Sequence, residues 1–165
     1  MFETIPFSAT TERLGLERDD AAWVEARLRD PATRFLPMHG LRALTAGDRL
    51  AWLTAADLPD PDDLDHLPRV LLGDAGEGCR FVVDVSAGEP PEAACWERHG
   101  RFVDARTLAA LLPPADSGLL AQARSLTDWH ARHRFCARCG SATAAAWSLP
   151  RSAACCSATP GRCWP

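Results

Sequence analysis

Apolar residues first recur with helical spacing and then alternate with polar ones. An acidic pair ending at Asp20 precedes an amphipathic run over residues 21–29, and Pro31 follows it, so we expect a capped helix there. Residues 33–38 and 49–54 have the alternation and composition of strands. Because glycine turn signals lie between these two strands, we expect them to pair antiparallel.

Two further apolar runs rich in β-branched residues span residues 69–72 and 79–85. The glycine-rich stretch between them, residues 73–78, lacks the Lys-Ser/Thr of a phosphate-binding P-loop and is not followed by a helix. We therefore expect a β-hairpin. The preceding Pro/Asp-rich stretch, residues 57–68, shows no periodicity and is interpreted as a solvated connector.

The helical pattern returns in the last third of the chain. Asp104 is expected to cap a short helix that ends at the Pro113-Pro114 pair. A longer helix begins near Asp116 and carries one stripe at spacings of 3 and 4. The stripe consists of Leu119, Ala123, Leu126, His130 and His133. We interpret its two histidines as packing or solvent-exposed residues, although a mixed Cys/His metal site that includes His133 stays open.

A Cys-x-x-Cys-Gly motif, Cys136 to Gly140, follows this helix. Two thiolates on one tight turn form half of a zinc ribbon, and a second such pair is expected about 15–20 residues further on. Three cysteines lie in or just past that window: Cys155, Cys156 and Cys163. Adjacent cysteines point in different directions, so only one of the first two joins a tetrahedral site easily. The candidate metal ligands are Cys136, Cys139, Cys155 and Cys156.

Composition narrows the class of protein. The 165 residues are 47% hydrophobic with a net charge of −4, which supports one sizeable core and no basic surface for nucleic acid or an anionic membrane. No apolar run approaches the roughly 20 residues that span a bilayer. The first residues lack a signal-peptide pattern, so we expect a cytoplasmic location with reduced thiols. Cys79 and Cys95 are then interpreted as ordinary buried or half-buried thiols.

Four segments together resemble one family, the NADH pyrophosphatases among the Nudix hydrolases. They are residues 102–106, 116–126, 129–130 and 135–140. The resemblance implies a Nudix-like amino-terminal domain, a helix, a four-cysteine zinc ribbon and a catalytic Nudix domain, assembled as a homodimer. It also implies structural zinc and catalytic magnesium or manganese. The intact family hydrolyses NADH, NAD or NAD-capped RNA at the pyrophosphate, giving NMN(H) and AMP or a 5′-phosphorylated RNA.

The same resemblance gives Arg106 the role of contacting the dinucleotide substrate, and a guanidinium suits phosphate through bidentate hydrogen bonds. A surface arginine paired with Asp104 or with a helix end is the other interpretation.

A catalytic Nudix domain requires clustered glutamates to hold its divalent metals. No Glu follows Glu97, no acidic residue follows Asp128, and no R-E-x-x-E-E pattern occurs. We therefore expect no pyrophosphate hydrolysis by this chain alone. Residues 144–165 contain no acidic residue and no apolar period. Because the chain lacks Lys, Tyr and Asn, a frameshift after Thr143 in a GC-rich gene is one hypothesis, and a natural short variant is the other.

The sequence thus predicts an α+β protein in four parts. They are a Nudix-like amino-terminal domain over 1–113, a connecting helix over 114–134, a first zinc knuckle over 135–143 and an aberrant or disordered tail over 144–165. The expected function is that of an amino-terminal fragment of an NAD(H) pyrophosphatase-like hydrolase. The alternative is a noncatalytic zinc-binding module for dimerisation or interaction.

Overall fold

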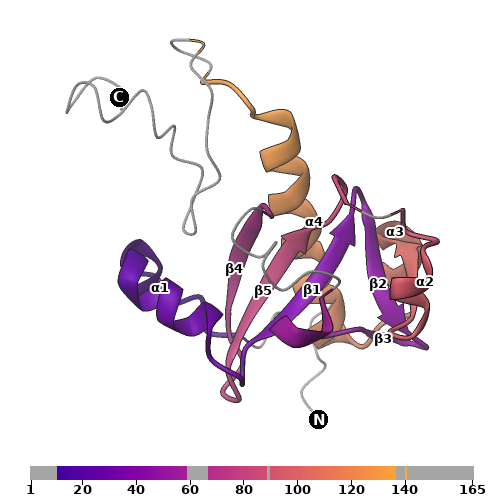
Figure 1. The fold of residues 1–165 in the computed structure, drawn as a ribbon, viewed down its shortest axis with the longest axis horizontal. Coiled ribbons are helices and arrows are strands. Elements are labelled where there is room, and N and C mark those ends of the chain that lie inside the picture. Colours follow the sequence, from indigo (N-terminus) through magenta and orange to yellow (C-terminus); the bar gives the residue numbers. More distant parts are fainter. Residues whose placement is uncertain (1–10, 59–66, 89, 137–139, 141–165) are drawn as a thin grey trace.

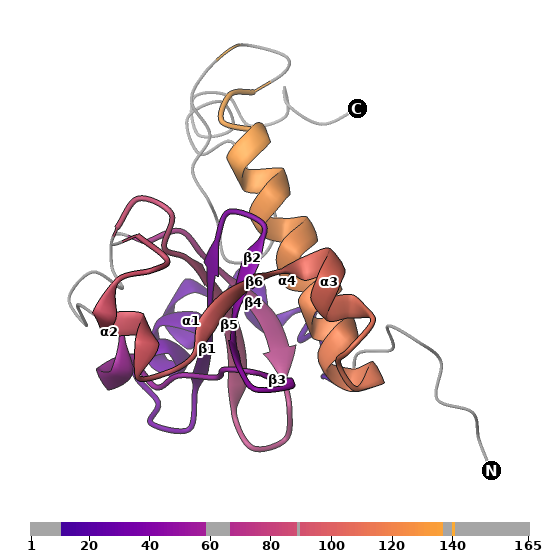
Figure 2. The same cartoon turned by 90° about the vertical axis from the view of Figure 1, so that its right-hand side faces the viewer.

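Helices cover both faces of one mixed β-sheet (Figures 1 and 2). The computed structural model describes residues 11–58, 67–88, 90–136 and 140. Its α-helices are α1 (Ala21–Leu28), α2 (Ala94–Glu97), α3 (Ala105–Ala109) and α4 (Pro114–Arg132). Its strands are β1 (Arg34–His39), β2 (Arg42–Ala46), β3 (Arg49–Leu50), β4 (Arg69–Asp74), β5 (Cys79–Asp84) and β6 (Arg101–Asp104). Two 3₁₀ turns, Glu17–Asp19 and Ala55–Asp57, complete these elements. The predicted α+β class is confirmed.

The sheet combines one parallel pair with several antiparallel pairs. Five strands follow in the order β3-β2-β1-β5-β4, and β6 also pairs with β2. Strands β1 and β5 are parallel, with Phe35 opposite Phe81, whereas the β1-β2, β2-β3, β2-β6 and β4-β5 pairs are antiparallel. Strand β2 thus connects the amino-terminal strands to β6 and the helices that follow it.

Each face of the sheet has its own hydrophobic core, because successive side chains of a strand point to opposite faces. Phe35 of β1 and Phe81 of β5 pack with α1 and the buried Trp96 of α2. Their strand neighbours Leu36 and Val82 instead pack with α3 and α4. The second core therefore fixes α4 on the domain.

The capped first helix is confirmed. Helix α1 begins at Ala21, and the Asp20 side chain accepts hydrogen bonds from the backbone N–H groups of Ala22 and Trp23 at 3.0 and 3.1 Å. These bonds satisfy two of the donors that a helix start leaves open. The buried residues of α1 are Val24 and Leu28, in agreement with an amphipathic helix.

The predicted pairing of residues 33–38 with 49–54 is largely wrong. A further strand, β2, lies between them in the sequence and pairs with both β1 and β3. Direct contact between the two predicted strands is limited to an isolated bridge, in which Phe35 and Leu53 exchange backbone hydrogen bonds of 2.8 and 2.9 Å. Two short hairpins thus replace the single expected one, because the five residues of β2 fit between the turns at Gly40 and Gly47.

The predicted hairpin after residue 68 is confirmed. Strands β4 and β5 pair antiparallel over most of their length, with a register shift between Leu71 and Gly73. Most of the connector predicted over 57–68 lies outside the described residues, as does the tail predicted over 144–165.

Both predicted carboxyl-terminal helices are present. Helix α3 starts after Asp104, whose side chain accepts a 2.9 Å hydrogen bond from the backbone N–H of Arg106. Helix α4 starts at Pro114, slightly before the predicted Asp116, and proline suits this first turn because its missing N–H would have no partner there. Within the residues that the structure describes, no helix is long and apolar enough to cross a membrane.

Candidate functional site

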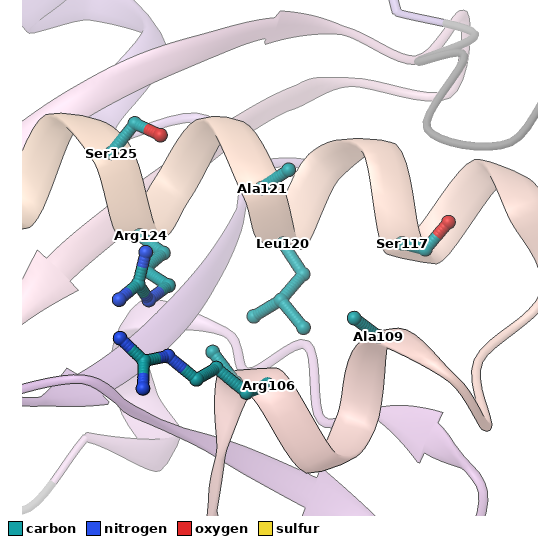
Figure 3. A pocket seen from close by; sticks show the side chains of 8 residues that line it. Arg106, Ala109, Ser117, Leu120, Ala121, Arg124 and Ser125 are labelled. Carbon is teal, nitrogen blue, oxygen red and sulfur yellow. The ribbon is translucent and has the colours of Figure 1, made fainter.

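A small pocket of about 180 Å³ lies where α3 packs against α4 (Figure 3). Helix α3 contributes Ala105, Arg106 and Ala109. Helix α4 contributes Ser117, Leu120, Ala121, Arg124 and Ser125. Two arginines and no acidic residue line this space, so its charge is positive.

Arg106 enters the pocket from the first turn of α3. The Asp104 cap binds the backbone N–H of this residue and so fixes the start of the helix. The Arg106 side chain is exposed and extends toward α4 (Figure 3). The sequence-predicted substrate residue therefore lines the described pocket together with a second arginine.

That second arginine is Arg124, on the facing side of α4. Its side chain is half-buried, and its Nε is buried with no hydrogen-bond partner among the described residues. Figure 3 shows its guanidinium pointing toward that of Arg106. The acidic residue one turn further along the helix, Asp128, already pairs with Arg132 through a 2.9 Å contact between Oδ1 and Nε.

The apolar lining of the pocket belongs to the core. Leu120 is 1% exposed and Ala105 is 3% exposed. Because packed core residues do not move without cost, the two helices and the bases of the arginine side chains are held in place. The hydroxyl of Ser117 donates a 2.8 Å hydrogen bond to the carbonyl of Pro114, so the side-chain donors left toward the pocket are the two guanidinium groups and the Ser125 hydroxyl.

Polar contacts also anchor α4 on the sheet. Asp116, with 10% of its side chain exposed, accepts a 2.7 Å hydrogen bond from Nε of Arg49 in β3, and this contact raises the pKa of Arg49. Further along the helix, the Gln122 side-chain amide donates a 2.9 Å hydrogen bond to the carbonyl of Leu72 in β4. The pocket is thus formed before any ligand binds.

The predicted zinc ligands can be placed only in part. Cys136 is half-buried just past α4, whereas Cys139, Cys155 and Cys156 lie outside the described residues. In the part of the chain that is described, no group of three or more His, Cys, Asp or Glu side chains could hold a metal ion. The four-cysteine site stays a prediction.

The histidines near the end of α4 surround Trp129. The His133 ring stacks on this indole with centroids 4.3 Å apart, and the His130 ring meets it edge-on at 5.3 Å. Burial lowers the pKa of His130. His130 is half-buried and His133 is exposed, which agrees with the interpretation of these histidines as packing or solvent-exposed residues.

The two thiols upstream also fit their interpretation. Cys79 is 1% exposed and belongs to the core beside α1, and burial raises the pKa of its thiol. Cys95 is half-buried in α2. A thiol that stays protonated is a poor nucleophile, which excludes Cys79 as a reactive group in the folded state.

Arg124 was not singled out by its sequence. An arginine in an amphipathic helix is ordinarily solvated, and nothing in its local pattern distinguishes it from Arg132. The available signal was its spacing on α4: Arg124 lies four residues after Leu120 and three before Thr127, which places it on the face of the helix where both of these residues are buried.

Comparison with known proteins now identifies the fold. Residues 32–129, more than half of the chain, match the family described as "NADH pyrophosphatase-like rudimentary NUDIX domain". This range contains all six strands and both arginines of the pocket.

Curated relatives agree with this match. The chain is 31% identical over 171 aligned residues to "NAD-capped RNA hydrolase NUDT12" of Homo sapiens and of Macaca fascicularis, with 83% of the chain and 37% of each relative covered. It is 35% identical over 63 residues to "NAD-capped RNA hydrolase" of Schizosaccharomyces pombe, with 36% of the chain and 17% of the relative covered. The chain thus spans little more than a third of the length of the human and macaque relatives. It belongs to the family of NADH pyrophosphatase-like rudimentary NUDIX domains.

Proposed function

We propose that this chain acts as the amino-terminal, substrate-contacting part of an NAD(H) pyrophosphatase-like Nudix hydrolase and does not cleave the pyrophosphate by itself. The observation that carries this proposal is the family match over residues 32–129. The sequence supports it as well, since no Nudix box of clustered glutamates occurs in the 165 residues.

In this proposal Arg106 contacts a phosphate of the dinucleotide. Its location in a pocket that contains a second arginine and no acidic residue supports this role. A guanidinium offers two parallel donors to a phosphoryl group and keeps its charge at every physiological pH. The residue orients the ligand and does not act as a nucleophile or base.

The complete reaction requires a catalytic Nudix domain. We propose that the assembled enzyme is a homodimer that hydrolyses NADH, NAD or NAD-capped RNA to NMN(H) and AMP or 5′-phosphorylated RNA. Magnesium or manganese would serve that domain, and a structural zinc would be held by Cys136 and Cys139 with Cys155 or Cys156. The names of the relatives, NAD-capped RNA hydrolases, support the substrate class.

A turnover assay tests the central part of this proposal. The purified chain is incubated with NADH and Mg²⁺ or Mn²⁺, and NMNH and AMP are separated by chromatography, with a nucleotide pyrophosphatase as the positive control. We expect no product above the buffer blank. Product that increases in proportion to the chain, and that Arg106→Gln reduces, would overturn the proposal. Product that is unchanged in Arg106→Gln and disappears on further purification comes from a contaminating hydrolase, whereas product that persists would also overturn the proposal.

Zinc content is measured separately by mass spectrometry of the native protein. One zinc per wild-type chain and none in Cys136→Ser would support the cysteine site. A metal-free wild-type chain would contradict it.

A further inference from the structure

We infer that Arg124 and Arg106 together form a binding site for the pyrophosphate group of a free nucleotide, between α3 and α4. The inference rests on the proposed function for the identity of the ligand, and it adds Arg124 and a location to it. The pocket that both residues line, about 180 Å³ in volume, carries the argument (Figure 3).

The first step is the unbalanced charge. Two guanidinium groups point toward one another from facing helices, and none of the lining residues is acidic. Like charges at close range repel, and a low-dielectric surrounding strengthens this repulsion. An anion between the two guanidinium groups would be attracted to both of them. Binding of an anion would therefore offset the repulsion between the two positive charges.

Five arginines of the described chain have carboxylate partners within 3.3 Å. They are Arg27, Arg29, Arg42, Arg49 and Arg132, paired with Asp30, Glu25, Glu92, Asp116 and Asp128, respectively. For Arg106 and Arg124 the acidic residues near in sequence are engaged elsewhere. Asp104 caps α3 through the backbone, and Asp128 binds Arg132. The two carboxylates nearest in sequence are thus engaged away from the guanidinium groups of the pocket.

The second step is the buried Nε of Arg124. It has no hydrogen-bond partner among the described residues, and a buried donor without an acceptor is unfavourable. A phosphate oxygen in the pocket is an acceptor of the right kind, because phosphoryl groups bind the fork of a guanidinium through parallel hydrogen bonds. Such a ligand would bind the terminal nitrogens of this guanidinium, because Nε itself has almost no surface open to the pocket.

The third step is size. Pockets that enclose a whole drug-sized ligand measure about 300–1,000 Å³. The pocket here is smaller, about 180 Å³, so it suits a phosphate or pyrophosphate group while the rest of a nucleotide lies outside. The buried Leu120 and the small side chains of Ala109 and Ala121 line it, and an apolar lining strengthens charge-assisted hydrogen bonds by limiting water.

Calorimetric titration of the full chain with inorganic pyrophosphate tests the inference. The variants are Arg106→Gln and Arg124→Gln, and the matched control is Arg29→Gln, which removes one positive charge from an exposed ion pair at the end of α1, on the other face of the sheet. We expect each pocket variant to bind about 10- to 100-fold more weakly, since a hydrogen bond to a charged group contributes on that scale. The control should remain within about twofold of the wild type.

The thermal midpoint separates a binding role from a structural one. A residue that holds the fold together would lower the midpoint when replaced. Replacing Arg124 by glutamine removes a facing charge and a buried donor without a partner, so we expect the midpoint to stay constant or rise while binding is lost. Weaker binding together with a midpoint lowered by several degrees would overturn the assignment.

Two further outcomes would also overturn it: no measurable binding of pyrophosphate to the wild type at millimolar concentration, or equal weakening in Arg29→Gln. Titrations with NADH and with a short NAD-capped RNA identify the source of the group. We expect free NADH to bind at least as tightly as pyrophosphate, and binding of the RNA alone would contradict a free-nucleotide site. The proposed lack of cleavage is tested by turnover, so a failed titration without turnover overturns this inference and the phosphate contact of Arg106 but leaves the rest of the proposed function in place.

Discussion

Helix α4 is part of the folded domain in this structure, and Leu120→Ala tests that directly. The Leu120 side chain is 1% exposed and packs in the core between the sheet and the two carboxyl-terminal helices. Leu111 offers a matched control, because it lies between α3 and α4 and is 67% exposed.

The expected size of the effect follows from burial. Truncation of a buried leucine removes its transfer free energy and leaves a cavity, which together cost about 2.7–5 kcal/mol in a well-packed core. Domains of this size have a total stability of about 5–15 kcal/mol, so the variant would lose a large fraction of it. An exposed leucine has little to lose, and Leu111→Ala should stay within about 0.5 kcal/mol of the wild type.

Urea unfolding followed by tryptophan fluorescence measures both variants. With a urea dependence of about 1.5–2 kcal/mol per molar, a loss of about 3 kcal/mol lowers the midpoint by about 1.5–2 M. A shift for Leu120→Ala no larger than that for Leu111→Ala would refute the packing of α4 on the sheet, and the helix would then be only a connection to the cysteine motif.

Three further predictions follow from particular residues. Gly100→Ala should destabilise the protein by more than about 2 kcal/mol in thermal unfolding, because the new Cβ would lie 1.9 Å from the Thr45 carbonyl oxygen. Gly47→Ala is the control: this glycine has φ +64° and open space around it, so the loss should be about 1 kcal/mol. Equal losses of stability in the two variants would contradict the predicted clash. Burial lowers the folded-state pKa of His130, so the unfolded chain binds the proton more readily and stability falls as the pH drops below about 6.5. His130→Gln should therefore lose less stability than the wild type between pH 7.5 and 5.5 in urea unfolding, and an equal loss would contradict the buried histidine. Cys79 should resist a thiol reagent in the native state, because the side chain is buried and burial raises the pKa of its thiol. Cys79→Ala should therefore leave the number of fast-reacting thiols unchanged. A decrease by one would show that the Cys79 thiol is accessible.

Local signals predicted much of the secondary structure. An aspartate that binds the first free N–H groups identified the start of α1, and two apolar runs around a glycine-rich loop identified the β4-β5 hairpin. These features depend on neighbours in the sequence. The strand β2 was missed because its five residues lie close to glycine turn signals on both sides and were interpreted as part of the connection.

Long-range features could not be predicted in the same way. The parallel pairing of β1 with β5 joins residues more than 40 positions apart, and no local pattern specifies the partner of a strand. The candidate site depends on such placement too. Arg106 was proposed from the family resemblance, whereas Arg124 could be assigned to the pocket only from the packing of α4 against α3.

Phosphorus NMR of NADH mixed with the purified chain and Mg²⁺ tests the central claim most directly, because it reports binding and cleavage in one sample. The account predicts that the pyrophosphate resonance shifts with added wild-type protein, does not shift with Arg124→Gln, and keeps its full intensity over hours. Conversion of that resonance into the two monophosphate signals of NMNH and AMP, in proportion to the chain, would contradict a domain that binds the dinucleotide without cleaving it.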